Sequence, residues 1–137
     1  MADLTRKYKN SEKKTLCVSS ALLKHGDVTT GSNELFKLPP DALIVDACVV
    51  VEEAGQASLT VDFGFSGGSE LGNDLDIDAI SVVSVPLAAG VKAPRLVTGT
   101  GKTVTATFSA DPTAGKFHFI VEYIEYTKGC GELTNLV

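Results

Sequence analysis

Three carboxylates at every second position are the side chains of this sequence best placed to do chemistry. They lie in the run GNDLDIDAI, at Asp74, Asp76 and Asp78. The pattern D-x-D-x-D opens an EF-hand calcium loop, which also needs glycine at its sixth position and glutamate at its twelfth. Ala79 and Val85 occupy those positions here. The run therefore predicts an acidic strand edge, with an adventitious or structural cation and a catalytic acid cluster as the alternatives.

The two histidines are the other candidates for acid–base chemistry. His25 stands beside Gly26 in an expected loop, where a single histidine is usually solvated. His118 shares a face of its predicted strand with Glu122, and such a pair could act as an acid–base couple. No G-x-S-x-G nucleophile motif accompanies it, and GTGKT at 99–103 lacks the spacing of a phosphate loop. We therefore expect no enzyme, no metal site and no cofactor.

The elements that must position these residues show a period of two. The segment SLTVDFGF at 58–65 alternates apolar and polar residues, as a half-buried antiparallel strand does. KTVTATF at 102–108 repeats the pattern, with its threonines expected on the solvated face. In the acidic run, Leu75 and Ile77 are expected to point inward between the carboxylates.

Two further segments, 42–51 and 117–126, are apolar on both faces, as central or doubly covered strands are. Weaker strand candidates lie at 15–20, 34–38 and 79–85. Glycine- and proline-containing turns separate these runs, and almost no helical periodicity is present. The pattern predicts an all-β fold: a single antiparallel β-sandwich of about seven or eight strands, in the form of a jelly roll.

Charge divides the chain into a basic N-terminal arm, residues 1–14, and an acidic body, residues 15–137. The net charge is −5, but five of the twelve basic residues fall within the arm. They are Arg6, Lys7, Lys9, Lys13 and Lys14. The arm has three interpretations: a solvated tail, an extended segment that docks on a neighbouring acidic surface, or a nonspecific nucleic-acid contact. We expect no specific nucleic-acid binding, because the body is acidic and no aromatic side chains interleave the basic ones.

The cysteines and the hydropathy pattern bear on the compartment. Cys17, Cys48 and Cys130 show no paired spacing that predicts a disulfide framework or zinc, and the first two are expected to be small core residues. No signal peptide is visible, and no apolar run approaches the length of a membrane helix. We expect a soluble protein made in a reducing cytoplasm, with no membrane partner.

Three segments together resemble the small virion structural proteins of tailed bacteriophages. They are LFKLPPDALIVDACVVVEEA, SLTVDFGFSGGSE and KTVTATFSADPTAGKFHFIVEYIE. The shared features are a Leu-Pro turn before a valine-rich strand, an L-x-V-x-x-G strand, and a closing D-P-T-x-G turn before a V-E-Y strand. The resemblance covers roughly residues 33–127.

The resemblance implies a jelly-roll capsid cement, or decoration, protein without catalytic residues. Such a protein binds the major capsid protein or another virion protein across capsomer junctions, often as a homo-oligomer (a dimer or trimer). From charge alone we add the arm and Asp74, Asp76 and Asp78 as candidate contacts. The alternatives are a head–tail joining, tail or fibre-associated virion protein and, from other classes, a glycan-binding sandwich or a jelly-roll enzyme. The expected location is the virion, after assembly in the host cytoplasm.

Overall fold

The computed structural model describes residues 16–84, 97 and 100–125 of the chain. These residues form eight β-strands and one short 3-10 helix. In chain order they are β1 (Cys17–Lys24), η1 (His25–Asp27), β2 (Gly31–Leu38), β3 (Ala42–Glu53), β4 (Thr60–Phe65), β5 (Gly72–Asp76), β6 (Ser81–Ser84), β7 (Lys102–Phe108) and β8 (Lys116–Glu125). The arm predicted at 1–14 lies outside the described residues.

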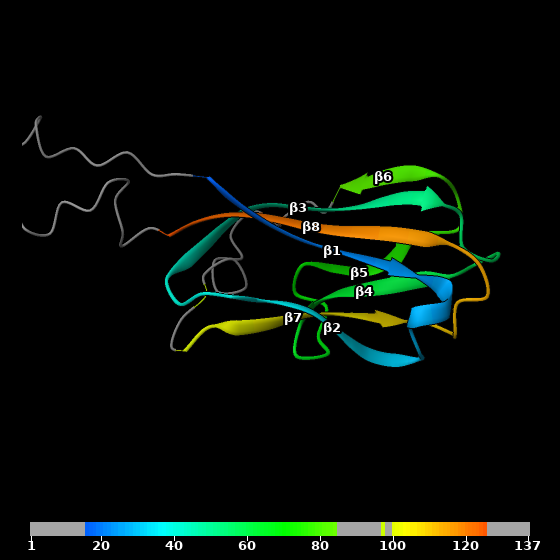
Figure 1. The fold of residues 1–137 in the computed structure, drawn as a ribbon, viewed down its shortest axis with the longest axis horizontal. Coiled ribbons are helices and arrows are strands. Elements are labelled where there is room, and N and C mark those ends of the chain that lie inside the picture. The colour runs from blue at the N-terminus through cyan, green and yellow to red at the C-terminus, as the bar shows by residue number, and fades with distance from the viewer. Residues whose placement is uncertain (1–15, 85–96, 98–99, 126–137) are drawn as a thin grey trace, which may run out of the picture.

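The strands form two antiparallel four-stranded sheets that pack as a sandwich (Figure 1). Sheet A has the order β1-β8-β3-β6, and sheet B has the order β2-β7-β4-β5. Along the chain, only β4 and β5 are consecutive strands of the same sheet; every other connection passes between the sheets. The predicted all-β antiparallel sandwich is therefore confirmed.

The core lies between the sheets and follows directly from the alternation of side chains in the strands. Phe63 of β4 meets Phe119 of β8 across the sandwich, edge to face, with ring centroids 5.3 Å apart. Phe108 of β7 packs against both Phe117 and Phe119. Aromatic side chains bury large areas and gain from such edge-to-face geometry. These rings join the centres of the two sheets.

Each strand predicted from the sequence has a counterpart in the structure. The inward residues expected in β4 and β7 are all buried, namely Val61, Phe63, Phe65, Val104, Ala106 and Phe108. One threonine of β7 departs from the prediction. Thr105 was expected on the solvated face, but only 2% of it is exposed. Its hydroxyl accepts a hydrogen bond from Gly67 N–H at 2.8 Å, because the glycine-rich loop after β4 folds over it.

Two turns hold the ends of the sandwich. After the Pro39–Pro40 pair, Asp41 N–H donates to the Val97 carbonyl at 3.0 Å, and Val97 N–H donates to the Ala42 carbonyl at 2.8 Å. At the other end, the turn before β8 closes at Gly115, whose φ of 116° favours glycine. The Gly115 carbonyl accepts His25 N–H at 3.1 Å, so η1 is tied to the turn.

Candidate interaction surfaces

The acidic run lies at an edge of sheet B, since β5 is the outermost strand there. A β-bulge places Asn73 and Asp74 opposite one residue of β4, Asp62, whose carboxylate accepts the Asp74 N–H at 2.9 Å. Asp74 takes a positive φ of 51° at this bulge. A bulge and acidic side chains are two ways in which proteins keep an edge strand from pairing with another chain.

The three carboxylates of the run have different surroundings. The Asp78 carboxylate accepts the Ser58 N–H at 3.2 Å and so closes the turn before β4. The Asp74 carboxylate accepts the side-chain amide of Asn73 at 3.1 Å. Asp76 is exposed, and within the described residues its carboxylate has no hydrogen bond or ion pair.

The apolar residues between these carboxylates point largely as expected. Ile77 is fully buried, and Leu75 packs against the core. Among the residues that the structure describes, no group of three or more His, Cys, Asp or Glu side chains is arranged to hold a metal ion.

His118 pairs with a different carboxylate from the one considered at the sequence level. Its Nδ1 lies 3.0 Å from Glu52 Oε1 of β3, and Lys116 Nζ lies 3.2 Å from Glu52 Oε2. The hydrogen bond and charge of Lys116, together with His118, lower the pKa of Glu52 despite some desolvation. The β3–β8 register places Glu122 opposite Asp46 instead. The cluster is a surface ion-pair network that connects two strands.

The outer face of sheet A is largely apolar, and we call it the apolar face. Three rows of side chains cross it in register. They are Leu22–His118–Val50–Val82, then Ser20–Ile120–Cys48–Ser84, then Val18–Glu122–Asp46. Val18, Leu22 and Val82 are 59%, 41% and 62% exposed. Contiguous exposed apolar side chains on a soluble domain are typical of interaction sites.

Cys48 lies on this face, and its predicted place in the core is therefore wrong. Its neighbours along β3, Ala47 and Val49, point inward and are buried, so strict alternation turns Cys48 outward. Partial burial, with the nearby carboxylates of Asp46 and Glu122, raises the pKa of its thiol. Cys17 has the core-facing register of β1 but is only half-buried.

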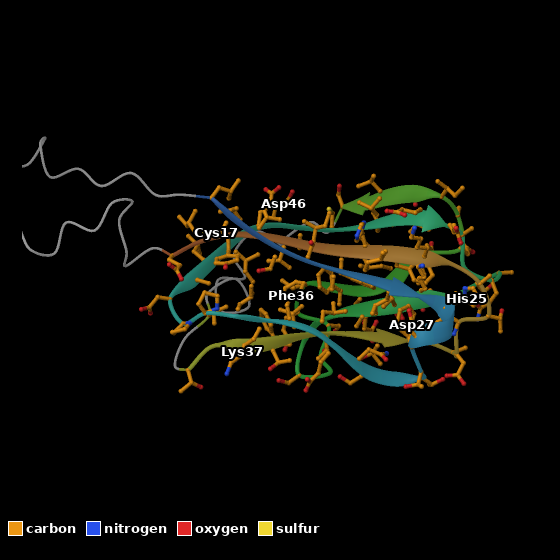
Figure 2. All side chains as sticks on the ribbon, in the orientation of Figure 1. Cys17, His25, Asp27, Phe36, Lys37 and Asp46 are labelled. Atoms are coloured by element: carbon orange, nitrogen blue, oxygen red, sulfur yellow. The ribbon has the colours of Figure 1, made fainter. Side chains whose placement is uncertain are left out.

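The acidic end of the apolar face is formed by Asp46 and Glu122. Figure 2 shows Asp46 at the same end of the molecule as Cys17, the first residue of β1, while His25 and Asp27 lie at the other end. At that other end the face carries the mixed cluster of Glu52, Lys116 and His118. The apolar side chains therefore lie between a negative end and an end that carries both signs of charge.

The outer face of sheet B has a different character. On this face the inner strand β7 carries three threonines, of which Thr105 is covered by the loop after β4, and polar residues flank them: Ser32 and Glu34 on β2, Thr60 and Asp62 on β4. Such a face is compatible with solvent without a partner. The two faces of the sandwich are thus chemically distinct, and only the apolar face gains substantially from being covered.

The sequence alone did not identify the residues of the apolar face. The sequence did indicate that a second apolar face exists, because 42–51 and 117–126 are apolar at consecutive positions. Which half of those residues faces outward depends on the packing of the second sheet. The basic residues predicted as contacts, Arg6 to Lys14, lie outside the described residues. Among the described residues, no helix is long and apolar enough to cross a membrane.

Comparison with known proteins adds information at the level of the fold. No family model matches the chain, and no curated protein matches it. A chain in the capsid of Ralstonia phage GP4 is similar over 85% of this chain and 87% of its own, with a TM-score of 0.63 and 22% identity.

Two other solved structures share the fold. A chain in the capsid asymmetric unit of cyanophage Pam1 is similar over 81% of this chain and 85% of its own, with a TM-score of 0.60 and 14% identity. A chain in the capsid of Helicobacter pylori bacteriophage KHP30 is similar over 83% of this chain and 93% of its own, with a TM-score of 0.51 and 18% identity. The sandwich is thus a fold found in chains of phage capsids, and it accounts for nearly the whole length of each of them.

Proposed function

We propose that this chain is a non-enzymatic virion structural protein that decorates a phage capsid and stabilises it by binding at capsomer junctions. The observation that carries the proposal is the shared fold, which extends over 85% of this chain and 87% of a chain in the Ralstonia phage GP4 capsid. The apolar face gives the proposal a physical basis, because it offers a surface that gains from burial against a virion protein.

We further propose that the sandwich is a jelly roll. The strand orders 1-8-3-6 and 2-7-4-5 support this, because consecutive strands alternate between the sheets except at the β4–β5 hairpin. This winding places the first strand, β1, at the edge of sheet A beside the last strand, β8, which is an inner strand.

The binding mechanism would combine several weak contacts. The apolar face would supply buried area, while the basic residues of the arm and the exposed carboxylate of Asp76 would supply charge-dependent contacts. Linked weak contacts reach high avidity because each later contact forms at a high effective concentration. The major capsid protein is the proposed partner.

Co-sedimentation tests this function. Purified protein is incubated with capsids that lack it and is then pelleted with them, with a heated capsid preparation as the control. We expect saturable binding and a higher temperature of capsid disruption. Absence from the pellet would contradict the decoration role, and recovery with isolated tails instead would favour the tail-associated alternative.

The charged contacts can be separated from the apolar ones. Replacing Arg6, Lys7, Lys9, Lys13 and Lys14 with glutamine should weaken capsid binding at low salt and reduce its dependence on salt concentration. Asp76→Asn should have a smaller effect in the same direction. Unchanged binding by both variants would remove these residues from the proposed contact surface.

A further inference from the structure

The free edge of β1 is the one strand edge in the described structure that lacks protection against pairing. β1 runs for eight residues in unbroken register with β8, without a bulge. From Cys17 to Leu23 it contains no charged residue and no proline. Between Val18 and Leu23 the edge is regular and uncharged, and such an edge presents unpaired N–H and C=O groups to any chain that can form a strand beside it.

The other three edges are each blocked in a recognisable way. β2 has a bulge after Glu34 and also carries Lys37. β5 has a bulge at Asp74 and carries Asp76. Within the described residues, β6 spans only Ser81–Ser84. Short length, bulges and charges are the usual means of preventing edge-to-edge association. β1 is eight residues long, has no bulge, and carries its single charge only at its last residue, Lys24.

Burial along β1 also indicates an incomplete edge. Its core-facing residues are Cys17, Ser19, Ala21 and Leu23, and all four are only half-buried. On the adjacent strand β8, the residues opposite Ser19, Ala21 and Leu23, namely Val121, Phe119 and Phe117, are fully buried, and Tyr123 opposite Cys17 is partly buried. The core is therefore closed at β8 and remains partly open at β1, where a further strand would cover it.

We propose that β1 pairs antiparallel with β1 of a second copy of this chain, with Ser20 opposite Ser20 across a two-fold axis. A strand pair that keeps the two apolar faces on the same side must join residues of like parity, because side chains alternate between faces. With Ser20 on the axis, Val18 stands opposite Leu22 of the second copy on the apolar face. Cys17 stands opposite Leu23, and Ser19 opposite Ala21, on the core side.

The self-complementarity of this register favours a second copy as the occupant. In the pairs Val18–Leu22 and Cys17–Leu23, apolar side chains meet apolar side chains. No like charges stand opposite each other between Cys17 and Leu23. The pairing would join two copies of sheet A into one continuous sheet, and their apolar faces into one doubled surface. The inference does not depend on the capsid role, since it concerns the purified chain alone.

Engineered disulfides test the register. In a background of Cys17→Ser, Cys48→Ser and Cys130→Ser, Ser20→Cys places two thiols opposite each other. Directly opposed residues of antiparallel strands have Cα atoms about 4.5–5.5 Å apart, within disulfide range. The control, Leu22→Cys, lies on the same face, but its two copies would be separated by about 13 Å along the strands.

We expect mild oxidation to convert most Ser20→Cys protein to a covalent dimer and to leave Leu22→Cys monomeric. Equal cross-linking of the two variants, or none in either, would overturn the proposed pairing. The cysteine-free background must first show the same sedimentation as the native chain, so that a folding defect is recognised.

A charge substitution provides an independent measurement. Ser20→Lys places two ammonium groups opposite each other, and analytical ultracentrifugation should show dimer affinity reduced at least tenfold. Ser84→Lys adds the same charge to the same face at the opposite edge, on β6, and should leave the dimer intact. A wild-type chain that stays monomeric at high concentration, or a dimer broken by Ser84→Lys alone, would refute the proposal.

Discussion

At the scale of single residues, Thr105 and Thr107 of β7 illustrate how a hydrogen-bond partner determines whether a buried hydroxyl stabilises the fold. The Thr105 hydroxyl accepts from Gly67 N–H and lies 3.4 Å from the Gly64 carbonyl, and the residue is buried. The Thr107 hydroxyl is also buried but has no hydrogen-bond partner within the described structure. A buried polar group without a partner carries a desolvation cost that nothing offsets.

Replacing each threonine with valine should therefore have opposite results. Thr105→Val leaves the Gly67 N–H unpaired and should lower the free energy of unfolding by about 1–3 kcal/mol. Thr107→Val should leave stability unchanged within about 0.5 kcal/mol, or raise it. Urea denaturation of both variants checks this, and an equal loss in the two would contradict the assigned hydrogen bond.

Glu52 is expected to make stability depend on pH. Its pKa is lowered in the folded state from the ordinary 4.5, chiefly by Lys116. A carboxyl whose folded pKa is lowered stabilises the fold above its unfolded pKa, and this contribution is lost as the pH falls through the folded value. Glu52→Gln should therefore be less stable than wild type at pH 7, and the difference should be lost as the pH falls through the lowered pKa of Glu52.

Unfolding curves at pH 7 and at a pH below the lowered pKa of Glu52 measure this difference. Glu34→Gln removes the same charge from an exposed carboxylate on sheet B and is the matched control. No gap between Glu52→Gln and wild type at pH 7 would show that the Lys116 and His118 contacts do not stabilise the fold, and a gap that persists at low pH would assign the loss to another cause than the carboxylate charge.

At the scale of elements, the two faces of β3 have different surroundings: one faces the core and the other belongs to the apolar face. Val49 points inward and is fully buried, whereas Val50 lies half-buried on the apolar face beside His118. The same valine-to-alanine change at these adjacent positions should have unequal effects. Val49→Ala removes buried methyl groups and leaves a cavity, and should cost about 2–3 kcal/mol.

Val50→Ala should cost less than about 1 kcal/mol, because its side chain is only partly removed from water. Thermal or urea unfolding monitored by circular dichroism gives both values. Equal losses would mean that the apolar face is covered within the monomer, and would argue against its use as a contact surface.

At the scale of the whole molecule, the difference between the two outer faces predicts which one contacts the capsid. Val82→Asp puts a charge on an exposed position of the apolar face and should leave the free energy of unfolding within about 0.5 kcal/mol of wild type. Capsid binding should fall at least tenfold, because the charge would have to be buried.

Ser32→Asp is the matched control, since it adds the same charge at an exposed position on the outer face of sheet B. Capsid co-sedimentation should be unaffected by this variant. Loss of binding with Ser32→Asp and retention with Val82→Asp would assign the contact to sheet B instead.

The local sequence pattern by itself determined the main strands of this protein, their buried faces and the exclusion of a calcium site. Alternation in 58–65 and 102–108 predicted two strands and their buried faces, because side-chain direction in a strand depends only on position. The missing glycine and glutamate excluded an EF-hand site at Asp74, Asp76 and Asp78, because that site has fixed ligand positions. The bulge at Asp74 could not be predicted, since it depends on the pairing of β5 with Asp62 of β4.

Only the tertiary structure decided which side of each doubly apolar strand is core and which is surface. Val49 and Val50 are chemically identical neighbours, and nothing local distinguishes them. Sheet B covers one face of sheet A and leaves the other open, and that packing made Cys48 a surface residue. The loop after β4 encloses Thr105, and the β3–β8 register pairs His118 with Glu52. The two faces and the free edge of β1 follow from contacts between residues distant in sequence, which no local pattern specifies.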